Sequence, residues 1–531
     1  NGQLWEEPVI EVDALTTLSA LSRANARRAP DRVAMRFEGR DTTFAEFDSH
    51  ASSVAGALER TGATRIAYLG KNSDWAFELY IGAGRAGGVF APVNWRLAPR
   101  EVAQIVQTFE PDVLFVGREF HDVVREISDE LPANLRFVAM EGGHEAWPSY
   151  EDWREAGGVE PCIDHAQPER PALVLFTSGT TGLPKGVTLT HFNLLSQRVT
   201  SAAANFSYDN WLDDDVNLVA MPVAHIGGVG AWNLGFANAC ATVITREFGA
   251  ESTIDAIEKD RASRMFLVPA AVQMVVRHPR ATSADFSAVR SIFYGAAPMP
   301  LELLREAMAL IGCEFAQVYG MTETTGTVTI LMPEDHDPAG SPRMLSAGKA
   351  MPGAEICILN PEGEKLPPGA IGEVAIRSTT VMPGYWNNED ATRAVKSDDG
   401  WLRSGDAGYI DEDGYVFIHD RIKDMIVSGA ENVYPAEVEN AIFGHPDVGE
   451  VAVIGIPDDD WGEAVKAIVT ARPGHTVDQQ SVIDWARQRL AGFKCPKTVD
   501  VVAQMPRNAT GKLLKRELRK PYWEGRARQV N

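Results

Sequence analysis

Short apolar runs alternate with amphipathic stretches from about residue 60 to residue 320. The apolar runs have the length of buried strands, and the amphipathic stretches have the length and period of surface helices. Such an alternation predicts parallel strands joined by right-handed helical crossovers, and therefore sheets covered by helices. The predicted strands are residues 65–70, 88–92, 173–176, 217–223, 265–268, 291–294 and 315–319, and the predicted helices are 74–87, 192–206 and 301–311.

The pattern changes near residue 352, where turn signals become frequent. Pro-, Asp- and Gly-rich turns at 361–363, 367–369, 398–400 and 411–414 predict β-hairpins between them. After residue 420 the alternation returns on a smaller scale, with helices at 435–443 and 482–490 and strands at 451–456, 466–470 and 498–502. We therefore predict an α/β body with a β-rich subdomain at 1–420, and a small mobile α/β lid at 421–531.

Charge and cysteine content narrow the classes of function. The chain has 50 Lys and Arg against 73 Asp and Glu, a net charge of −23, which disfavours nucleic acid or an anionic membrane as the main partner. Residues 494–531 reverse this balance, with ten basic and three acidic residues. Such a basic segment is either a solvated helix or a local binding site for an anion. Five scattered cysteines without CxxC spacing indicate a reducing, cytoplasmic location and no zinc site.

The N-terminus and residues 226–245 are the two stretches that could be targeting or membrane segments. The N-terminus carries four acidic residues before residue 15 and lacks the basic start and apolar run of a signal peptide. Residues 226–245 are uncharged and nearly long enough to span a bilayer, but they contain four glycines and two asparagines. We expect them to form a buried helix or a pair of strands.

The strongest local feature is the run Phe176-Thr-Ser-Gly-Thr-Thr-Gly-Leu-Pro-Lys-Gly-Val187, expected between a strand and a helix. Its glycines let the backbone approach a ligand closely, and its hydroxyls, N–H groups and lysine can surround phosphate oxygens. It is not the P-loop pattern, because the fifth residue after Gly179 is Pro184 instead of glycine. The alternative is a flexible linker. The candidate phosphate ligands are Thr177, Ser178, Gly179, Thr180, Thr181, Gly182 and Lys185.

This run resembles the phosphate loop of the adenylate-forming superfamily, which contains acyl- and aryl-CoA synthetases, peptide-synthetase adenylation domains and firefly-type luciferases. Further segments resemble the family's motifs in the family's order, from about residue 25 to residue 520. They are Tyr294-Gly-Ala-Ala-Pro298, Gln317-Val-Tyr-Gly-Met-Thr-Glu-Thr-Thr325, Gly384-Tyr-Trp386, Trp401-Leu-Arg-Ser-Gly-Asp406, Asp420-Arg-Ile-Lys-Asp424, Glu431-Asn-Val-Tyr-Pro-Ala-Glu-Val-Glu439 and Pro506-Arg-Asn-Ala-Thr-Gly-Lys512.

The resemblance assigns nucleotide-binding roles. It implies that Tyr319 stacks on adenine, that Thr322 contacts the α-phosphate and that Glu323 helps to hold Mg²⁺, for which a carboxylate is a suitable ligand. Asp406 would accept hydrogen bonds from the ribose hydroxyls, and Arg421 would approach the ribose or the phosphates. Each residue could instead belong to an ordinary turn. The remaining residues implied at the nucleotide are Gly295, Ala296, Ala297, Gln317 and Gly320.

The lid residues receive catalytic and mechanical roles by the same resemblance. Lys512 would bridge the α-phosphate and the substrate carboxylate, where a cation offsets the repulsion of two anions. Lys423 would be the hinge about which the lid rotates. Rotation would replace Lys512 by the face around residues 428–430 for attack by the thiol. The alternative for Lys512 is a surface lysine.

One further segment is a candidate for the acyl pocket. Met221-Pro-Val-Ala-His225-Ile-Gly-Gly228 resembles the segment that places a histidine beside the substrate carboxylate, although a lone histidine in an apolar run is often a core residue. Trp232 and Met321 are further candidates for the pocket wall. No Arg or Lys cluster occurs in these stretches, which disfavours a dicarboxylate.

Taken together, the motifs predict an AMP-forming acyl-CoA synthetase that uses ATP, Mg²⁺ and coenzyme A on a fatty or aromatic monocarboxylic acid. The chain ends soon after Lys512, whereas a peptide-synthetase module would be expected to continue into a carrier domain. A stand-alone adenylation enzyme that loads a separate carrier protein is the alternative. A luciferase-type oxygenase lacks specific support. A non-catalytic homologue would be expected to have lost charged residues that this chain keeps. The family includes monomers and dimers, so a homodimer is one expected state.

Overall fold

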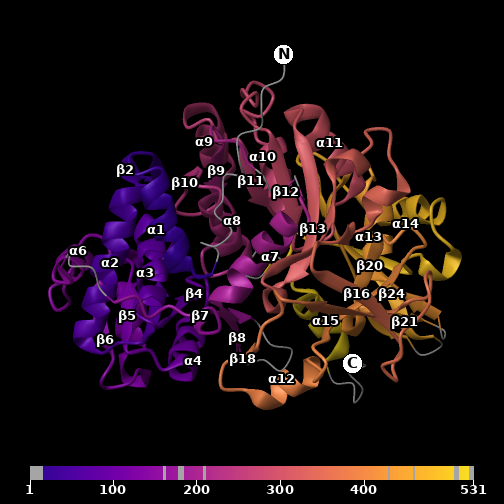
Figure 1. Ribbon diagram of the computed structural model, residues 1–531. Helices are drawn as coiled ribbons and strands as arrows, with labels where there is room; N and C mark the ends of the chain where they lie inside the picture. Colours follow the sequence, from indigo (N-terminus) through magenta and orange to yellow (C-terminus); the bar gives the residue numbers. More distant parts are fainter. Residues whose placement is uncertain are drawn as a thin grey trace.

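The computed structural model describes residues 16–158, 163–177, 184–206, 208, 211–428, 431–458, 461–507 and 513–524. Two large sheets occupy the first part of the chain (Figure 1). The nine-stranded sheet has the order β15 (Lys349–Ala350), β14 (Gly326–Leu331), β13 (Glu314–Met321), β12 (Ser291–Gly295), β11 (Arg264–Leu267), β9 (Val216–Val219), β10 (Ala241–Ile244), β1 (Val33–Phe37) and β2 (Arg40–Thr43). The seven-stranded sheet has the order β18 (Gly384–Tyr385), β8 (Lys185–Thr190), β7 (Pro171–Thr177), β4 (Val89–Val93), β3 (Arg65–Leu69), β5 (Val113–Val116) and β6 (Arg136–Ala139).

The predicted parallel, helix-linked strands are confirmed in the interior of both sheets. Strands β1, β10, β9, β11, β12 and β13 run parallel, as do β7, β4, β3, β5 and β6. Antiparallel strands complete both edges of the nine-stranded sheet and the β18 edge of the other, whose opposite edge is the parallel strand β6. The helices are α1 (Leu18–Arg28), α2 (Phe44–Thr61), α3 (Asp74–Arg85), α4 (Pro99–Phe109), α5 (His121–Glu126), α6 (Tyr150–Glu155), α7 (His191–Ala203), α8 (Ile226–Ala237), α9 (Ala250–Lys259), α10 (Pro269–Val276), α11 (Leu301–Ile311), α12 (Glu389–Val395), α13 (Pro435–Phe443), α14 (Gln479–Arg487) and α15 (Lys515–Trp523).

Helix α3 lies in the interior between the two large sheets. It contacts β1 of the nine-stranded sheet and β4 and β7 of the other, and all twelve of its residues are buried. Its buried charges are paired, as burial requires: Glu78 accepts hydrogen bonds from the Tyr150 hydroxyl at 2.7 Å and from Arg154 at 2.8 Å. Asp74 pairs with Arg40 at 2.8 Å.

A four-stranded antiparallel sheet follows the large sheets, as the dense turn signals predict. Its order is β16 (Ala354–Leu359), β17 (Gly372–Ser378), β19 (Leu402–Ile410) and β20 (Val416–Arg421). The last sheet has the order β22 (Glu431–Val433), β21 (Ile426–Ser428), β24 (Gly462–Ala471) and β23 (Val448–Asp458), with β25 (Thr498–Val501) parallel to β24. Figure 1 shows α13, α14, β21 and β24 on the side of the molecule that carries β16 and β20.

The uncharged stretch 226–245 divides into helix α8 and strand β10, which settles it as part of the folded core. Among the described residues, no helix combines the length and the hydrophobicity that crossing a bilayer would need. Helix α8 packs against strands β9, β10 and β11 and against α7. It therefore brings its first residue, and His225 before it, to the strand ends that carry the candidate site.

Candidate nucleotide and acyl site

Close backbone contacts shape the end of strand β13. A Cβ atom on Gly320 would lie 1.6 Å from the carbonyl oxygen of Gly326, and one on Gly295 would lie 2.1 Å from that of Val318. Only glycine fits at either position. Ala296 has a left-handed φ of +66°, and Gln317 pairs with Tyr294 in the neighbouring strand. The result is a cradle of small residues at the carboxyl ends of parallel strands, where ligands bind in α/β folds.

Three of the predicted ribose and adenine residues meet beside this cradle. The Tyr319 hydroxyl donates to Asp406 Oδ2 at 2.6 Å, and Arg421 Nε lies 3.0 Å from Asp406 Oδ1. The pairing of Asp406 with Arg421 across β19 and β20 sets this contact. Burial works against the charge of Arg421, but the neighbouring Asp406, Tyr319 and Glu323 raise its pKa. Asp406 is 6 % exposed, and its contacts with Tyr319 and Arg421 fix the position of its carboxylate.

Glu323 is held by a partner that the sequence reading left without a role. It lies in the 3₁₀ turn Thr322–Thr324 with 9 % exposure, and the Tyr385 hydroxyl donates to its Oε1 at 2.9 Å. Burial and the adjacent Glu323 raise the pKa of Tyr385, so the phenol stays protonated as the donor. Lys185 Nζ lies 5.2 Å from the centroid of the Tyr385 ring. The candidate metal ligand and the candidate phosphate lysine therefore flank one tyrosine.

The donor set at Glu323 suits Mg²⁺ bound together with phosphates. Mg²⁺ keeps several waters and takes one or two carboxylates from the protein in nucleotide sites. Within the described residues no group of three His, Cys, Asp or Glu side chains could form a metal cage. A single buried carboxylate beside the phosphate lysine fits a metal carried by a nucleotide better than a resident metal centre.

The sequence predicted that the phosphate run connects a strand to a helix, but in the structure it connects two strands. It leaves β7 at Thr177 and returns in β8 at Lys185, and these two residues pair antiparallel. The helix α7 begins only after β8. The prediction of an adjoining helix was wrong because the residues after Lys185 form strand β8, which lies between β7 and β18 in the sheet. Ser178, Gly179, Thr180, Thr181 and Gly182 lie outside the described residues.

His225 stands at the start of α8 beside Asn94. Its Nε2 lies 3.3 Å from Asn94 Nδ2. Burial, assisted by the charge of Arg96, lowers the pKa of His225 to about 4. The imidazole is therefore neutral at physiological pH and would not form an ion pair with a substrate carboxylate. It can form a polar wall without acting as a counter-ion.

The other two pocket candidates have different environments. Trp232 has no exposed surface and stacks on Phe77 at 4.5 Å and on Phe236 at 4.3 Å between ring centroids. That placement argues against contact between Trp232 and a substrate. Met321 is half-buried at the end of β13 and adjoins the turn that carries Glu323. It stays a candidate for the pocket wall.

The lid residues are described in part. Lys512 lies outside the described residues, as do the last two positions of the 428–430 segment. Lys423 is exposed in the short 3₁₀ turn Ile422–Asp424, directly after β20. A hinge at that place would move everything from β21 onward as one unit.

Tyr385 and Asn94 are the site residues that the sequence reading missed. Tyr385 stands in the motif Gly384-Tyr-Trp386, which was recognised without a role for its tyrosine. A more direct signal is its place in β18, which pairs with β8 and so adjoins Lys185. No local pattern marks Asn94.

We expect Asp406→Asn to weaken ATP binding about 10- to 100-fold, because a charged acceptor of hydrogen bonds contributes about 1.5–3 kcal/mol. The neutral amide would also leave Arg421 without its carboxylate partner. Direct titration of ATP measures the effect. Tyr319→Phe removes one hydrogen bond to Asp406 and keeps the ring, so it should have the smaller effect. An unchanged ATP dissociation constant in Asp406→Asn would remove this residue from the site.

Known proteins are similar to this chain in sequence and in fold. Residues 22–386 match the family model of the AMP-binding enzymes, and residues 437–512 match that of the AMP-binding enzyme C-terminal domain. A fatty acid–[acyl-carrier-protein] ligase, ScoC of Streptomyces coeruleorubidus, is 40% identical over 97% of this chain and 98% of its own length. An indoleacetate–CoA ligase of Aromatoleum aromaticum is 38% identical over 92% and 95%.

Solved structures agree with these matches. ATP-bound MatB from Rhodopseudomonas palustris superposes with a TM-score of 0.84 at 31% identity, covering 95% of this chain and 99% of that one. The ordered motifs, the meeting of Tyr319, Asp406 and Arg421, and the matches over both parts of the chain have one common explanation. The chain belongs to the AMP-binding, adenylate-forming enzyme family.

Proposed function

We propose that the protein is an ATP-dependent acid–thiol ligase that activates a carboxylic acid as an acyl-adenylate and transfers the acyl group to coenzyme A. The observation that carries this proposal is the meeting of Tyr319, Asp406 and Arg421 next to the buried Glu323. These groups can hold a nucleoside and leave its α-phosphate beside the start of α8. Relatives named as ligases or as a CoA synthase span nearly the whole chain.

The reaction divides into two displacements. In the first, a carboxylate oxygen of the acid attacks the α-phosphorus of ATP, the bond to the β-phosphate oxygen breaks, and pyrophosphate leaves. In the second, the acceptor sulfur attacks the acyl carbon, the bond to the AMP oxygen breaks, and the thiol proton passes to solvent. Mg²⁺, when bound, neutralises phosphate charge. Glu323 would hold it, Thr322 would contact the α-phosphate, and Lys512 would bring the two anions together.

The acid itself would lie along helix α8. Ile226 adjoins the strand β14 turn, since a Cβ on Gly326 would lie 3.5 Å from Ile226 Cγ1. Ile226, Gly230 and Leu234 are partly exposed and spaced four residues apart, so they share one face of α8. Space is open around Gly230, where an added Cβ would meet nothing within 4 Å. This apolar face favours a fatty or aromatic monocarboxylic acid.

We expect Gly230→Phe to shift activity toward short acids. The ring would occupy the open space on the face of α8, so activity on long or bulky acids should fall at least about tenfold, the scale of a few lost methylene contacts. Gly230→Ala is the matched control, because it adds only a methyl group and favours the helix. AMP release over a series of chain lengths measures the shift. Equal losses for every acid would show a folding defect or a different acyl path.

The acceptor is the second part of the proposal. The names of three kinds of relative support coenzyme A: indoleacetate–CoA ligase, feruloyl-CoA synthase and a long-chain-fatty-acid–CoA ligase. The 40%-identical ScoC is named for a carrier-protein acceptor instead. Loading of a separate carrier protein is therefore the second candidate function. Both acceptors present a thiol, so the adenylation site is the same for either.

One lid surface suits the nucleotide end of coenzyme A. Trp461 is 52 % exposed, and Lys497 Nζ lies 5.7 Å from its ring centroid. Ser428 pairs with Gly462, so Trp461 adjoins the segment that is proposed to face the acyl-adenylate for thiol attack. An exposed indole beside a lysine can stack on a base and attract phosphates.

Trp461→Ala is expected to raise the KM for coenzyme A about tenfold, since stacking of a base on an aromatic ring contributes about 1–3 kcal/mol. The measurement is thioester formation at varied coenzyme A. ATP–pyrophosphate exchange needs no acceptor and reports separately on adenylation in the same preparation. A KM that stays the same would place the acceptor elsewhere on the lid.

The decisive experiment measures AMP release over a panel of medium-chain, long-chain, benzoic and cinnamic acids, each without acceptor, with coenzyme A and with a holo-carrier protein. Release that depends on coenzyme A supports the first proposal, and release only with the carrier supports the second. Once an acid is found, Lys512→Ala should abolish its adenylation. No release and no ATP–pyrophosphate exchange with any acid would contradict both.

We further propose a body at residues 1–420, a lid at residues 421–531 and rotation about Lys423. The exposed 3₁₀ turn after β20 supports this division, because it separates the four-stranded sheet from the last sheet. We also propose a reducing, cytoplasmic site of action. The described cysteines Cys240, Cys313, Cys357 and Cys495 are all free thiols.

A further inference from the structure

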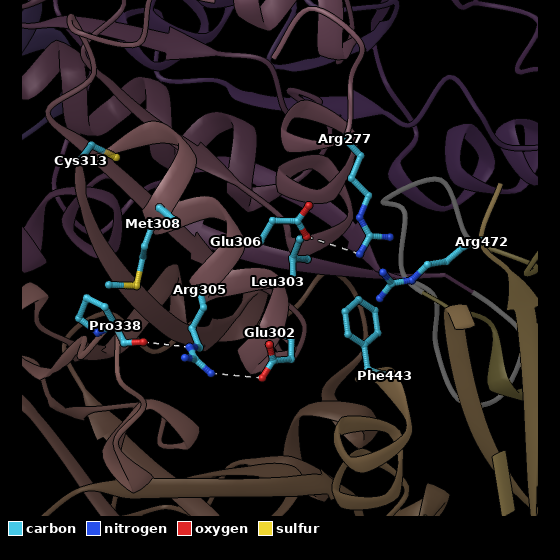
Figure 2. A pocket seen from close by; sticks show the side chains of 11 residues that line it. Arg277, Glu302, Leu303, Arg305, Glu306, Met308, Cys313, Pro338, Phe443 and Arg472 are labelled. Carbon is cyan, nitrogen blue, oxygen red and sulfur yellow. Dashed lines mark hydrogen bonds and ion pairs between the residues drawn. The ribbon is translucent and has the colours of Figure 1, made fainter. Parts of the chain in front are cut away.

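A pocket of about 690 Å³ lies between helix α11 and the C-terminal part of the chain (Figure 2). None of the residues assigned to the nucleotide or acyl site lines it. Its walls come from two parts of the molecule. Helix α11 and the residue after α10 lie on one side, and the last residue of α13 and the residue after β24 lie on the other. The lining residues are Arg277, Glu302, Leu303, Arg305, Glu306, Met308, Ala309, Cys313, Pro338, Phe443 and Arg472.

Two arginines face each other at one end of the pocket. Figure 2 shows the guanidinium groups of Arg277 and Arg472 close together beside the ring of Phe443. The Arg277 guanidinium carbon lies 5.8 Å from the centroid of that ring. Burial lowers the pKa of Arg277, and the like charge of Arg472 lowers it further. Like charges at this spacing oppose each other unless an anion lies between them.

The acidic residues of the pocket neutralise only some of its arginines. Glu306 lies 3.6 Å from Arg277, and Glu302 lies 3.4 Å from Arg305. Arg472 donates a hydrogen bond from its Nε–H to the carbonyl oxygen of Val448 at 2.9 Å. In the described part of the chain, no carboxylate lies within ion-pair distance of Arg472. The Arg472 end of the pocket thus keeps one uncompensated positive charge in a chain whose net charge is −23.

Apolar side chains line much of the rest of the pocket. Leu303, Met308 and Ala309 come from α11, and Cys313 follows the end of that helix. The Arg305 guanidinium, also in the lining, is held by the Pro338 carbonyl oxygen at 2.9 Å and by Glu302 at 3.4 Å, as Figure 2 shows. The pocket therefore offers a cationic end and an apolar trough within one volume of the size that organic ligands occupy.

We propose that this pocket binds an organic anion with an apolar tail, its carboxylate or phosphate between Arg277 and Arg472 and its tail along Leu303, Met308 and Ala309. A bidentate guanidinium is the side chain best suited to either anion. Because Arg277 and Leu303 belong to the body while Phe443 and Arg472 belong to the lid, a bound anion joins the two. It therefore stabilises the lid arrangement seen here over a rotated one.

The test is calorimetric titration of the full chain with four probes: decyl phosphate, decanoate, decanol and inorganic phosphate. Saturating decanoyl-sulfamoyl-adenosine, a stable mimic of an acyl-adenylate, occupies the active site throughout. We expect decyl phosphate or decanoate to bind, and decanol and inorganic phosphate each to bind at least about tenfold more weakly, since each lacks one half of the recognition. The two anionic probes distinguish a phosphate from a carboxylate as the preferred headgroup.

Paired variants locate the site. Arg277→Gln with Arg472→Gln should weaken binding of the anionic probe at least about tenfold. Arg393→Gln with Arg487→Gln is the matched control, with the same change in charge at exposed body and lid positions, and should bind like the wild type. Equal affinity in both double variants, or no binding of either anionic probe, would overturn the proposal. The inference about the lid rests on the proposed function, but binding does not: the paired arginine variants test the pocket, whereas absence of adenylation over the whole panel of acids would count against the proposed function alone.

Discussion

Glu323→Gln should reduce the rate of acyl-adenylate formation about 10²- to 10³-fold, the loss expected when one preorganised electrostatic contact is removed. The amide keeps the size of the side chain and can still accept the hydrogen bond from Tyr385, which lies at 2.9 Å from Oε1. It loses the negative charge that would hold Mg²⁺ beside the phosphates. ATP–pyrophosphate exchange measured over a range of Mg²⁺ concentrations gives both the rate and the metal dependence.

Tyr385→Phe is the matched control for this prediction. It removes the hydrogen bond to Glu323 and leaves the carboxylate and the ring under Lys185 in place. We expect a loss of about tenfold or less, the worth of one hydrogen bond to a charged group. If Glu323→Gln loses no more than Tyr385→Phe, and needs no more Mg²⁺, the carboxylate does not hold the metal.

The sequence predicts best those elements whose ends carry their own signals. Helices α11 and α13 have the predicted bounds. The first ends at Gly312 in the left-handed conformation, with φ +72°, and the second begins with Pro435 at its first position. Both have one apolar face against a sheet, so the 3.6-residue period is visible in the chain.

Elements with two buried faces or with an edge position are harder to predict. Strand β8, next to the two-residue edge strand β18, reads as a continuation toward helix α7, because the local pattern does not reveal its partner strands. Helix α3 was predicted from residue 74, but its burial on all sides was not, because Asp74, Glu78 and Arg85 suggest an exposed face. Their long-range partners lie 28 or more residues away and become neighbours only in the folded chain.

The candidate site shows the same division. The resemblance to a family supplied roles for Tyr319, Asp406 and Arg421, and the structure brings all three together. It supplied none for Tyr385, which reaches Glu323 across 62 residues of sequence. Nor could spacing reveal that Trp232 is enclosed by aromatic rings. Contacts set by tertiary packing need coordinates, whereas contacts set by adjacent strand ends follow from the order of the motifs.

The second large effect concerns the joint between β20 and the lid. Lys515 Nζ lies 3.1 Å from Asp420 Oδ2 and 2.9 Å from Glu439 Oε1, and the Lys515 side chain is 14 % exposed. Replacing Lys515 with Met should leave two carboxylates facing each other without a cation, at a cost of about 3–5 kcal/mol. Because α15 packs against β23, we expect the lost stability to appear as local opening within the lid, with α15 separating from β23. Hydrogen exchange of the β23 amides measures it without assuming that the whole chain unfolds in one step.

The destabilisation of Lys515→Met should grow with pH. Burial raises the pKa of Glu439, and Lys515 is the main group that opposes this rise. Without the lysine, Glu439 takes up a proton on folding, so stability is retained below its unfolded pKa and lost as pH rises through the higher folded pKa. Adding Glu439→Gln to Lys515→Met should recover much of the lost stability, while Lys520→Met, an exposed change on the same helix, should cost little. A loss equal at pH 5 and pH 8, or no recovery by Glu439→Gln, would show that the lysine contributes packing and not charge.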